Sequence, residues 1–178
     1  MGVSKSAEVA GLIWRQAYGP IMVDISELLK YNQRVRRKYF ECLTKLSWDE
    51  FTKNREASFH SIRNIFIHTL NAVDYWLSFL QKEDFKPRRK FDEYETFQDV
   101  KEYMEHVEKR TSNYLQTLSS TKLNETYSAT DDDGKPVEVT AEDVLIHVFE
   151  EEVHHRGELI ALLWQMNIEP PMMSWKNL

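Results

Sequence analysis

The sequence predicts an all-α protein, a four-helix bundle with a short hairpin or extended excursion before its last helix. Of its 178 residues, 42% are hydrophobic and 29% are charged, and the chain has only five glycines and five prolines. This composition is typical of a helix-rich globular domain. Apolar residues also recur at helical spacing in four long stretches, which polar or proline-containing segments separate. We expect an N-terminal extension at residues 1–21 and the bundle domain at residues 22–178.

The first two helices are predicted from a start signal and from apolar periodicity. An Asp-Ile-Ser-Glu run opens residues 24–46 and resembles a capping box, in which an N-cap side chain is followed by glutamate three residues later. Residues 47–57 are mostly polar and are predicted to be a connection. The second helix is expected at residues 58–81, with a main apolar stripe and a second strip beside it. His68 lies at the outer edge of that second strip, whereas Arg63, Asn71 and Asp74 point elsewhere.

The second half of the chain begins with a charged loop at residues 82–95. A Thr-Phe-Gln-Asp capping box then predicts a third helix at residues 96–118. Two β-prone segments flank Asp133-Gly134, a dipeptide that favours a hairpin turn. A second capping box, Thr-Ala-Glu-Asp at residues 140–143, opens the fourth helix, which must end before Glu169-Pro170.

Charge and composition exclude several classes of function. A net charge of -6 argues against a nucleic-acid-binding surface. No apolar run reaches the roughly 18–20 residues that span a membrane, and the N-terminus lacks the features of a signal peptide. The lone Cys42 cannot form an intramolecular disulfide, and we expect a cytoplasmic protein. Two basic clusters are expected to be solvated patches: Arg34/Arg36/Arg37/Lys38 and Lys86/Arg88/Arg89/Lys90.

The fourth helix carries the residues with the clearest chemistry. Glu151 and His155 lie one helical turn apart, on the same arc as the apolar residues Val144, Val148, Leu159, Leu162 and Met166. A carboxylate on a core-facing arc is costly unless it is paired, protonated or bound to a metal. Side chains at i and i+4 are close enough to hold one cation together. His68 is the candidate third ligand, because its helix is the only other one that offers a histidine beside a strong apolar surface.

Simpler interpretations stand beside this metal hypothesis. His147 and His154 fit surface positions or positions behind the metal ligands, and His147 is also spaced to replace His155 as a ligand. Glu151 alternatively forms a salt bridge with Arg63 or another arginine. The Glu-x-x-His spacing of Glu151 and His154 is also typical of a di-iron carboxylate site. The chain, however, lacks the second Glu-x-x-His motif and the further inward glutamates that such a site needs.

Two segments resemble the signature of the DinB-like (YfiT-type) metalloenzyme superfamily. They are EEEVHHRGELIALLWQ at residues 150–165 and SIRNIFIHTLNAVDYW at residues 61–76, and the Tyr31-Asn32 pair also matches. The similarity extends from about residue 22 to 175. It implies a four-helix bundle that holds a divalent metal, usually nickel or zinc, on three histidines. Carried over, His68 and His155 are two of these ligands, and Glu151 replaces the third histidine. A carboxylate in that position favours harder ions such as iron or manganese.

The resemblance leaves two functions open. Some members of the superfamily are thiol-dependent transferases or isomerases, so the first hypothesis is a metalloenzyme with an open metal position for water or a low-molecular-weight thiol. Hydrolase-like chemistry belongs to the same hypothesis. The second is a non-enzymatic stress-response or interaction protein with a degenerate or structural metal site. The fourth helix is also apolar on its far side, at Phe149, Ile160 and Trp164, so either the N-terminal segment or a second subunit in a homodimer should cover it.

Overall fold

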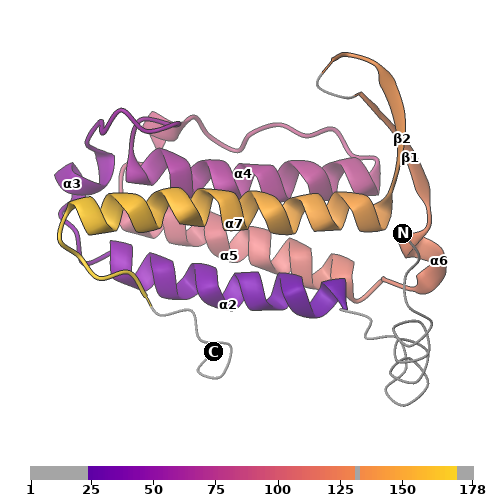
Figure 1. Ribbon diagram of the computed structural model, residues 1–178, viewed down its shortest axis with the longest axis horizontal. Coiled ribbons are helices and arrows are strands. Elements are labelled where there is room, and N and C mark those ends of the chain that lie inside the picture. The colour runs from indigo at the N-terminus through magenta and orange to yellow at the C-terminus, as the bar shows by residue number, and fades with distance from the viewer. Residues whose placement is uncertain (1–23, 131–132, 172–178) are drawn as a thin grey trace, which may run out of the picture.

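The computed structural model describes residues 24–130 and 133–171, and its four long helices form a bundle (Figure 1). They are α2 (Ile25–Leu43), α4 (Ile62–Gln81), α5 (Phe97–Leu115) and α7 (Ala141–Gln165). Short helices α3 (Trp48–Thr52), η1 (Phe91–Glu93) and α6 (Ser120–Leu123) lie within the predicted connections. The predicted all-α bundle is therefore confirmed. The expected extension at residues 1–21 and the end of the C-terminal tail lie outside the described residues.

The hairpin that precedes the last helix is also present. Strand β1 (Thr126–Thr130) pairs antiparallel with β2 (Pro136–Thr140), and Gly134 takes a left-handed φ of 79° near the turn. Figure 1 shows the hairpin at one end of the bundle, where β2 leads directly into α7. The buried Tyr127 fixes it there, because its hydroxyl donates a 3.1 Å hydrogen bond to the carbonyl of Leu80 at the end of α4.

Helix starts follow the capping signals closely in two cases and less closely in two others. Thr96 and Thr140 each form the predicted reciprocal capping box with the aspartate three residues later. Asp24 caps α2, but it accepts from the N–H of Ser26 and no reciprocal bond from Glu27 completes a box. Helix α4 begins at residue 62 instead of 58, because His60 has a φ of 70° and Ser61 supplies the cap.

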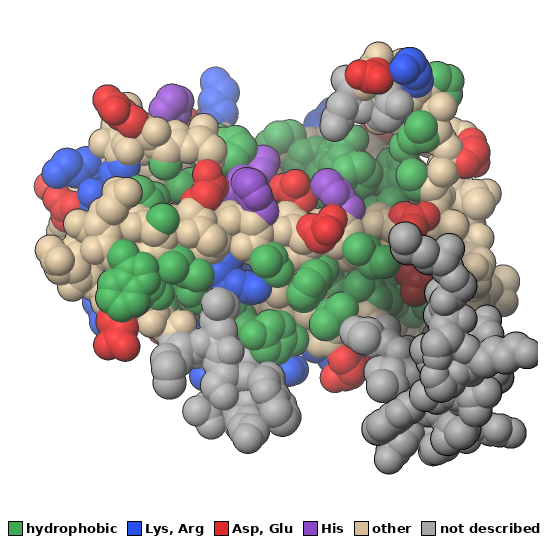
Figure 2. Space-filling view, in the orientation of Figure 1, with side chains coloured by type: hydrophobic (Ala, Val, Ile, Leu, Met, Phe, Trp, Pro, Cys, Tyr) green, Lys and Arg blue, Asp and Glu red, His purple; other side chains and the backbone are tan. Residues whose placement is uncertain are grey.

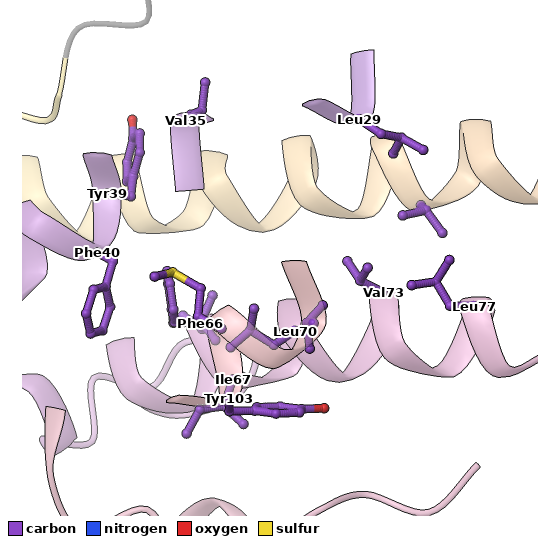
Figure 3. Packing of buried hydrophobic residues seen from close by; sticks show 14 of the residues in the cluster. Leu29, Val35, Tyr39, Phe40, Phe66, Ile67, Leu70, Val73, Leu77 and Tyr103 are labelled. Atoms are coloured by element: carbon purple, nitrogen blue, oxygen red, sulfur yellow. The ribbon is translucent and has the colours of Figure 1, made fainter. Parts of the chain in front are cut away.

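The core lies between the four long helices, and α4 contributes most to it. Helix α4 packs against both α5 and α7, so it is apolar on more than one side. Its residues Ile65, Leu70 and Leu77 are at most 1% exposed. Figure 3 shows Phe66, Leu70, Val73 and Leu77 of α4 among side chains of the neighbouring helices. Burial of this kind stabilises the fold by about 1.5–3 kcal/mol for each large apolar side chain.

One basic residue predicted to be solvated is instead buried. Arg36 on α2 is 5% exposed and donates to both carboxylate oxygens of Glu152 on α7, at 3.0 and 2.6 Å. The neighbouring Arg37 is exposed, as expected, but binds the buried Glu108 of α5. The solvated-patch prediction was therefore wrong for Arg36, because the partner that permits its burial lies 116 residues away along the chain.

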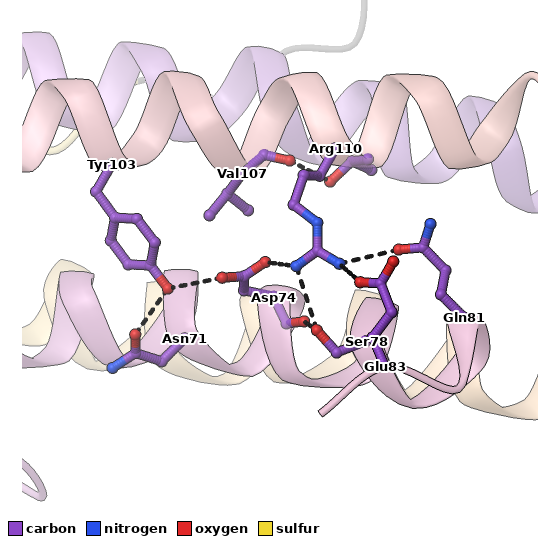
Figure 4. Close-up of polar contacts among 9 residues, drawn as sticks. Asn71, Asp74, Ser78, Gln81, Glu83, Tyr103, Val107 and Arg110 are labelled. Carbon is purple, nitrogen blue, oxygen red and sulfur yellow. Dashed lines mark hydrogen bonds and ion pairs between the residues drawn. The ribbon is translucent and has the colours of Figure 1, made fainter. Parts of the chain in front are cut away.

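A second buried polar group joins α4 to α5 (Figure 4). Asp74 is 6% exposed, pairs with Arg110, and accepts a 3.3 Å hydrogen bond from the hydroxyl of Tyr103. Arg110 also binds Glu83 at 2.6 Å. Burial, together with the nearby Asp74 charge, raises the pKa of Tyr103, so its hydroxyl remains a donor. These contacts satisfy the buried carboxylate and fix the register of the two helices.

Candidate metal site

Three of the predicted site residues meet where α4 crosses α7. His68 projects from α4, and Glu151 and His155 project from α7 one turn apart. Each offers a ligand atom, and these atoms all lie within 4.8 Å of one another. Figure 2 shows histidine and acidic side chains gathered on this face of the bundle. Because the two helices are far apart in sequence, the tertiary packing of α4 on α7 creates the cluster.

The distances centre on one oxygen of Glu151. Its Oε2 atom lies 3.4 Å from Nε2 of His155 and 3.8 Å from Nε2 of His68. Ligand atoms about 2.1 Å from a tetrahedral metal are separated by about 3.4 Å. The cluster therefore needs only small side-chain shifts to hold one divalent ion. The side chains of His68 and Glu151 are 27% and 28% exposed, so solvent reaches a site whose third member, His155, is buried.

The ring of His155 is oriented by a residue that the sequence did not single out. Its Nδ1 lies 2.6 Å from Oε2 of Glu158, one turn further along α7. Burial raises the pKa of Glu158, but hydrogen bonds from His155 and Ser58 outweigh it and leave that pKa below its ordinary value. The carboxylate therefore stays charged and accepts from Nδ1–H, which leaves Nε2 free as a metal ligand. The i to i+3 spacing of His155 and Glu158 was a signal for this contact.

The loop before α4 packs against the ring of His68. Phe59 stacks on the ring of His68, with 3.8 Å between ring centroids and 17° between planes. Its ring also meets that of His155 edge-on at 5.5 Å. Burial, and then the neighbouring His155, lowers the pKa of His68, although the charge of Glu151 opposes the shift. A neutral imidazole is the form that binds a metal.

The two histidines expected behind the ligands differ in position. Nε2 of His147 lies 3.8 Å from Oε1 of Glu151, the oxygen that faces away from the cluster, and its ring meets Trp76 edge-on at 5.1 Å. His154 is exposed and contacts the ring of His155 at 4.9 Å. His154, His155 and Glu158 form a second group with metal-binding spacing. We favour the first group, because in the second the Nδ1 of His155 is already hydrogen-bonded to Glu158.

The simpler interpretation of Glu151 as an arginine partner is wrong within the described chain. Arg63 instead contacts Asn64 and the carbonyl of Tyr94. The ion-pair contacts of Glu151 in this part of the chain are with three histidines: His68, His147 and His155. His106 on α5 is exposed.

Comparison with known proteins shows the family of the chain. The model of the DinB family matches residues 18–177. The chain belongs to the DinB family. It is also 27% identical over 150 residues to the uncharacterized protein YizA of Bacillus subtilis, a match that covers 84% of this chain and 92% of YizA.

Solved structures show the same fold. A DinB-like protein from Bacillus cereus matches with a TM-score of 0.64 and 18% identity, over 83% of this chain and 94% of that one. The DinB-like protein YjoA from Bacillus subtilis matches with a TM-score of 0.61 and 21% identity, over 83% and 97%. None of the helices described for this DinB-family chain has the length and hydropathy that crossing a bilayer requires.

Proposed function

We propose that this DinB-family protein is an enzyme that depends on a divalent metal bound by His68, Glu151 and His155. The convergence of these three side chains from two distant helices, with ligand atoms within 4.8 Å, is the observation that supports the proposal. Three protein ligands leave positions open for water or for a low-molecular-weight thiol. When bound, a divalent metal lowers the pKa of a thiol or of water, so that a nucleophile forms near neutral pH.

The donor set indicates which metal the site prefers. Two imidazoles and one carboxylate replace the three imidazoles that nickel and zinc members of the superfamily use. The extra negative charge and the harder oxygen ligand favour iron or manganese. The buried position of His155 and its bond to Glu158 add affinity for any divalent ion, because the ligand is held in one orientation.

Aromatic and histidine side chains surround the proposed metal position and limit access to it. Phe59 covers His68 on one ring face, and Trp76 lies beside His147 next to the outer oxygen of Glu151. His147 is 45% exposed on its side chain and is placed to exchange protons with solvent near Glu151. We assign His147 a proton-handling or positioning function in the same proposal.

Elemental analysis of freshly purified protein tests the metal directly. Wild-type protein should contain about one divalent ion per chain, and Glu151→Ala or His155→Ala should lose it while keeping its helical circular dichroism. His106→Ala, an exposed histidine on α5, is the matched control and should retain the metal. Stoichiometric metal in both site variants would overturn the assignment. A thiol-transfer assay and a hydrolase assay on the same samples would then separate the two chemistries.

A non-enzymatic interaction protein is the second candidate, and one observation favours it. Three large apolar side chains on the outer face of α7 are exposed: Ile146, Val153 and Trp164. Such a surface is typical of proteins that bind other proteins. Metal-free protein that still forms a stable complex through this face would favour this function over catalysis.

A further inference from the structure

A small cavity lined by both charged and apolar side chains lies between α2, α4 and α7, separate from the candidate metal site. Its volume is about 20 Å³. The lining includes Arg36 and Tyr39 from α2, Thr69 from α4, and Glu152 and Arg156 from α7. Thr69, Glu152 and Arg156 each directly follow one of the proposed ligands, so the cavity lies on a different side of the same two helices.

Two of these buried side chains have a donor without a partner. Arg36 is 5% exposed and Tyr39 is 2% exposed. Within the described chain, Nη1 of Arg36 and the hydroxyl of Tyr39 have no hydrogen-bond partner. Burying such a group without a partner costs about 1–3 kcal/mol, and more for a charged group. Burial raises the pKa of Tyr39 despite the nearby Arg156 charge, so its hydroxyl remains a donor.

The charges around the cavity do not balance. Glu152 neutralises Arg36, to which it is bound by two hydrogen bonds. Arg156 is half-buried and donates to Oδ1 of Asn32 at 3.2 Å, and no carboxylate of the described residues pairs with it. The hydroxyl of Thr69 donates elsewhere, to the carbonyl of Ile65. The cavity therefore has one excess positive charge and donors that need an acceptor.

We propose that this cavity binds a small monovalent anion of chloride size, held by Arg36, Tyr39 and Arg156. Such an ion would supply the missing acceptor to two buried donors and would offset the charge of Arg156. A volume of about 20 Å³ suits a single atom-sized ligand better than a polyatomic anion. Because the three anchoring side chains lie on α2 and α7, the bound ion would stabilise the packing of these two helices beside the candidate metal site.

Thermal unfolding at constant ionic strength tests the proposal. Sodium chloride and sodium bromide should raise the Tm by about 3–6 °C when the halide reaches about ten times its Kd, and sodium gluconate should not. Tyr39→Phe should raise the Kd for halide about tenfold, because the ion loses one hydrogen-bond donor. Arg156→Gln should weaken it at least as much. Arg34→Gln is the control for the loss of one charge. Arg34 is exposed on α2, the helix that carries Tyr39, and this variant should respond to halide like wild type.

Crystals grown with bromide identify the ligand and its position. Anomalous scattering from bromide between Arg36, Tyr39 and Arg156 is the expected result. An ordered water at that position without a bromide signal would overturn the proposal. A halide response that survives both Tyr39→Phe and Arg156→Gln would also overturn it, because the ion would then bind elsewhere, for example at the metal.

Discussion

At the scale of single residues, Glu158 is the contact that favours a metal site over a chance cluster of histidines. A surface histidine needs no partner on its second ring nitrogen, whereas a metal-binding histidine almost always donates that N–H to a carboxylate, a backbone carbonyl or a water. In this chain the carboxylate of Glu158 lies 2.6 Å from Nδ1 of His155. Glu158 is therefore a positioning residue whose effect on a bound metal can be measured.

Removal of the Glu158 side chain should weaken metal binding without removing a ligand. We expect Glu158→Ala to lower the affinity for a divalent ion by about 10–100-fold, because His155 loses the hydrogen bond that orients its ring. Glu158→Gln still accepts from Nδ1–H and should recover part of that loss. Isothermal titration with manganese or zinc measures both. The exposed Glu142 on the same helix provides the control, Glu142→Gln. Affinities unchanged in Glu158→Ala would show that the contact does not support a metal ligand.

Residue-scale features were predicted unevenly from the sequence. The trio of His68, Glu151 and His155 could be nominated because helical periodicity places two of them on one arc. The third, His68, is the histidine beside a strong apolar surface on another helix, and the family resemblance agrees. Glu158 was missed although it shares a helix with His155. Phe59 falls within the predicted second helix at residues 58–81, whereas it lies in the loop before α4 and stacks on His68. Its position depends on the left-handed backbone of His60, which is not a conformation that periodicity reveals.

At the scale of elements, the Arg36–Glu152 pair makes the contact between α2 and α7 sensitive to charge. The side chains of the two partners are 4% and 5% exposed. Glu152→Gln should cost about 3–5 kcal/mol of unfolding free energy, because it leaves a buried guanidinium uncompensated. The double variant Arg36→Met/Glu152→Leu should be markedly more stable than that single variant. Urea unfolding measures both. Glu27→Gln breaks the exposed pair with Lys30 and should cost only about 0–1 kcal/mol.

The start of α5 should carry a distinct pH dependence. Hydrogen bonds from Thr96, and then from Arg89, lower the pKa of Asp99 to about 2. A lowered pKa in the folded state gives stability that is present above the unfolded value of 3.8 and is lost as the pH falls toward 2. Asp99→Asn should therefore cost about 1 kcal/mol at pH 7 and progressively less below pH 4. Urea unfolding at several pH values measures this. Asp84→Asn, in the exposed loop before η1, controls for the loss of one charge, and an equal cost at pH 7 and pH 3 would contradict the capping interpretation.

The sequence predicted the positions of the long helices better than the polar contacts between them. Capping boxes at Thr96 and Thr140 fixed the starts of α5 and α7, because these motifs act within four residues. The burial of Arg36 and of Asp74 was not predictable, because each depends on a partner in another helix. A charged residue far from its partner in sequence looks the same as a solvated one. Local patterns therefore define helices, and the long-range polar pairs that fix their register appear only in the structure.

At the scale of the whole molecule, the metal should stabilise the bundle without being required to fold it. The core is built from apolar side chains of all four long helices. At a metal concentration of about 100 Kd, chelation should lower the Tm by about 5–10 °C and leave the helical circular dichroism intact. His155→Ala should show no response to the chelator. Loss of helicity on chelation at room temperature would instead make the metal structural, as in domains that fold only around their ion.

The outer face of α7 is a candidate interface with a second copy of the chain. An arc of about 80° on this helix contains Ile146, Phe149, Val153, Gly157, Ile160 and Trp164. Phe149 and Ile160 are partly buried, but Trp164 is 58% exposed. Gly157 lies on the same arc, and a Cβ there would meet nothing within 4 Å, so its small size serves no close helix contact within the described chain. Such a face suits the close approach of a helix from a second copy.

We therefore expect a homodimer that packs through this face of α7. Val153→Glu should weaken dimerisation on the order of a hundredfold, because it places an unpaired carboxylate in an apolar interface. Light scattering across a concentration series measures the shift from dimer to monomer, and circular dichroism should remain unchanged because Val153 is 39% exposed. Tyr75→Glu, an exposed apolar position on α4, is the matched control. A wild-type chain that is monomeric at all concentrations would assign the face to another partner, and a dimer insensitive to Val153→Glu would place the interface elsewhere.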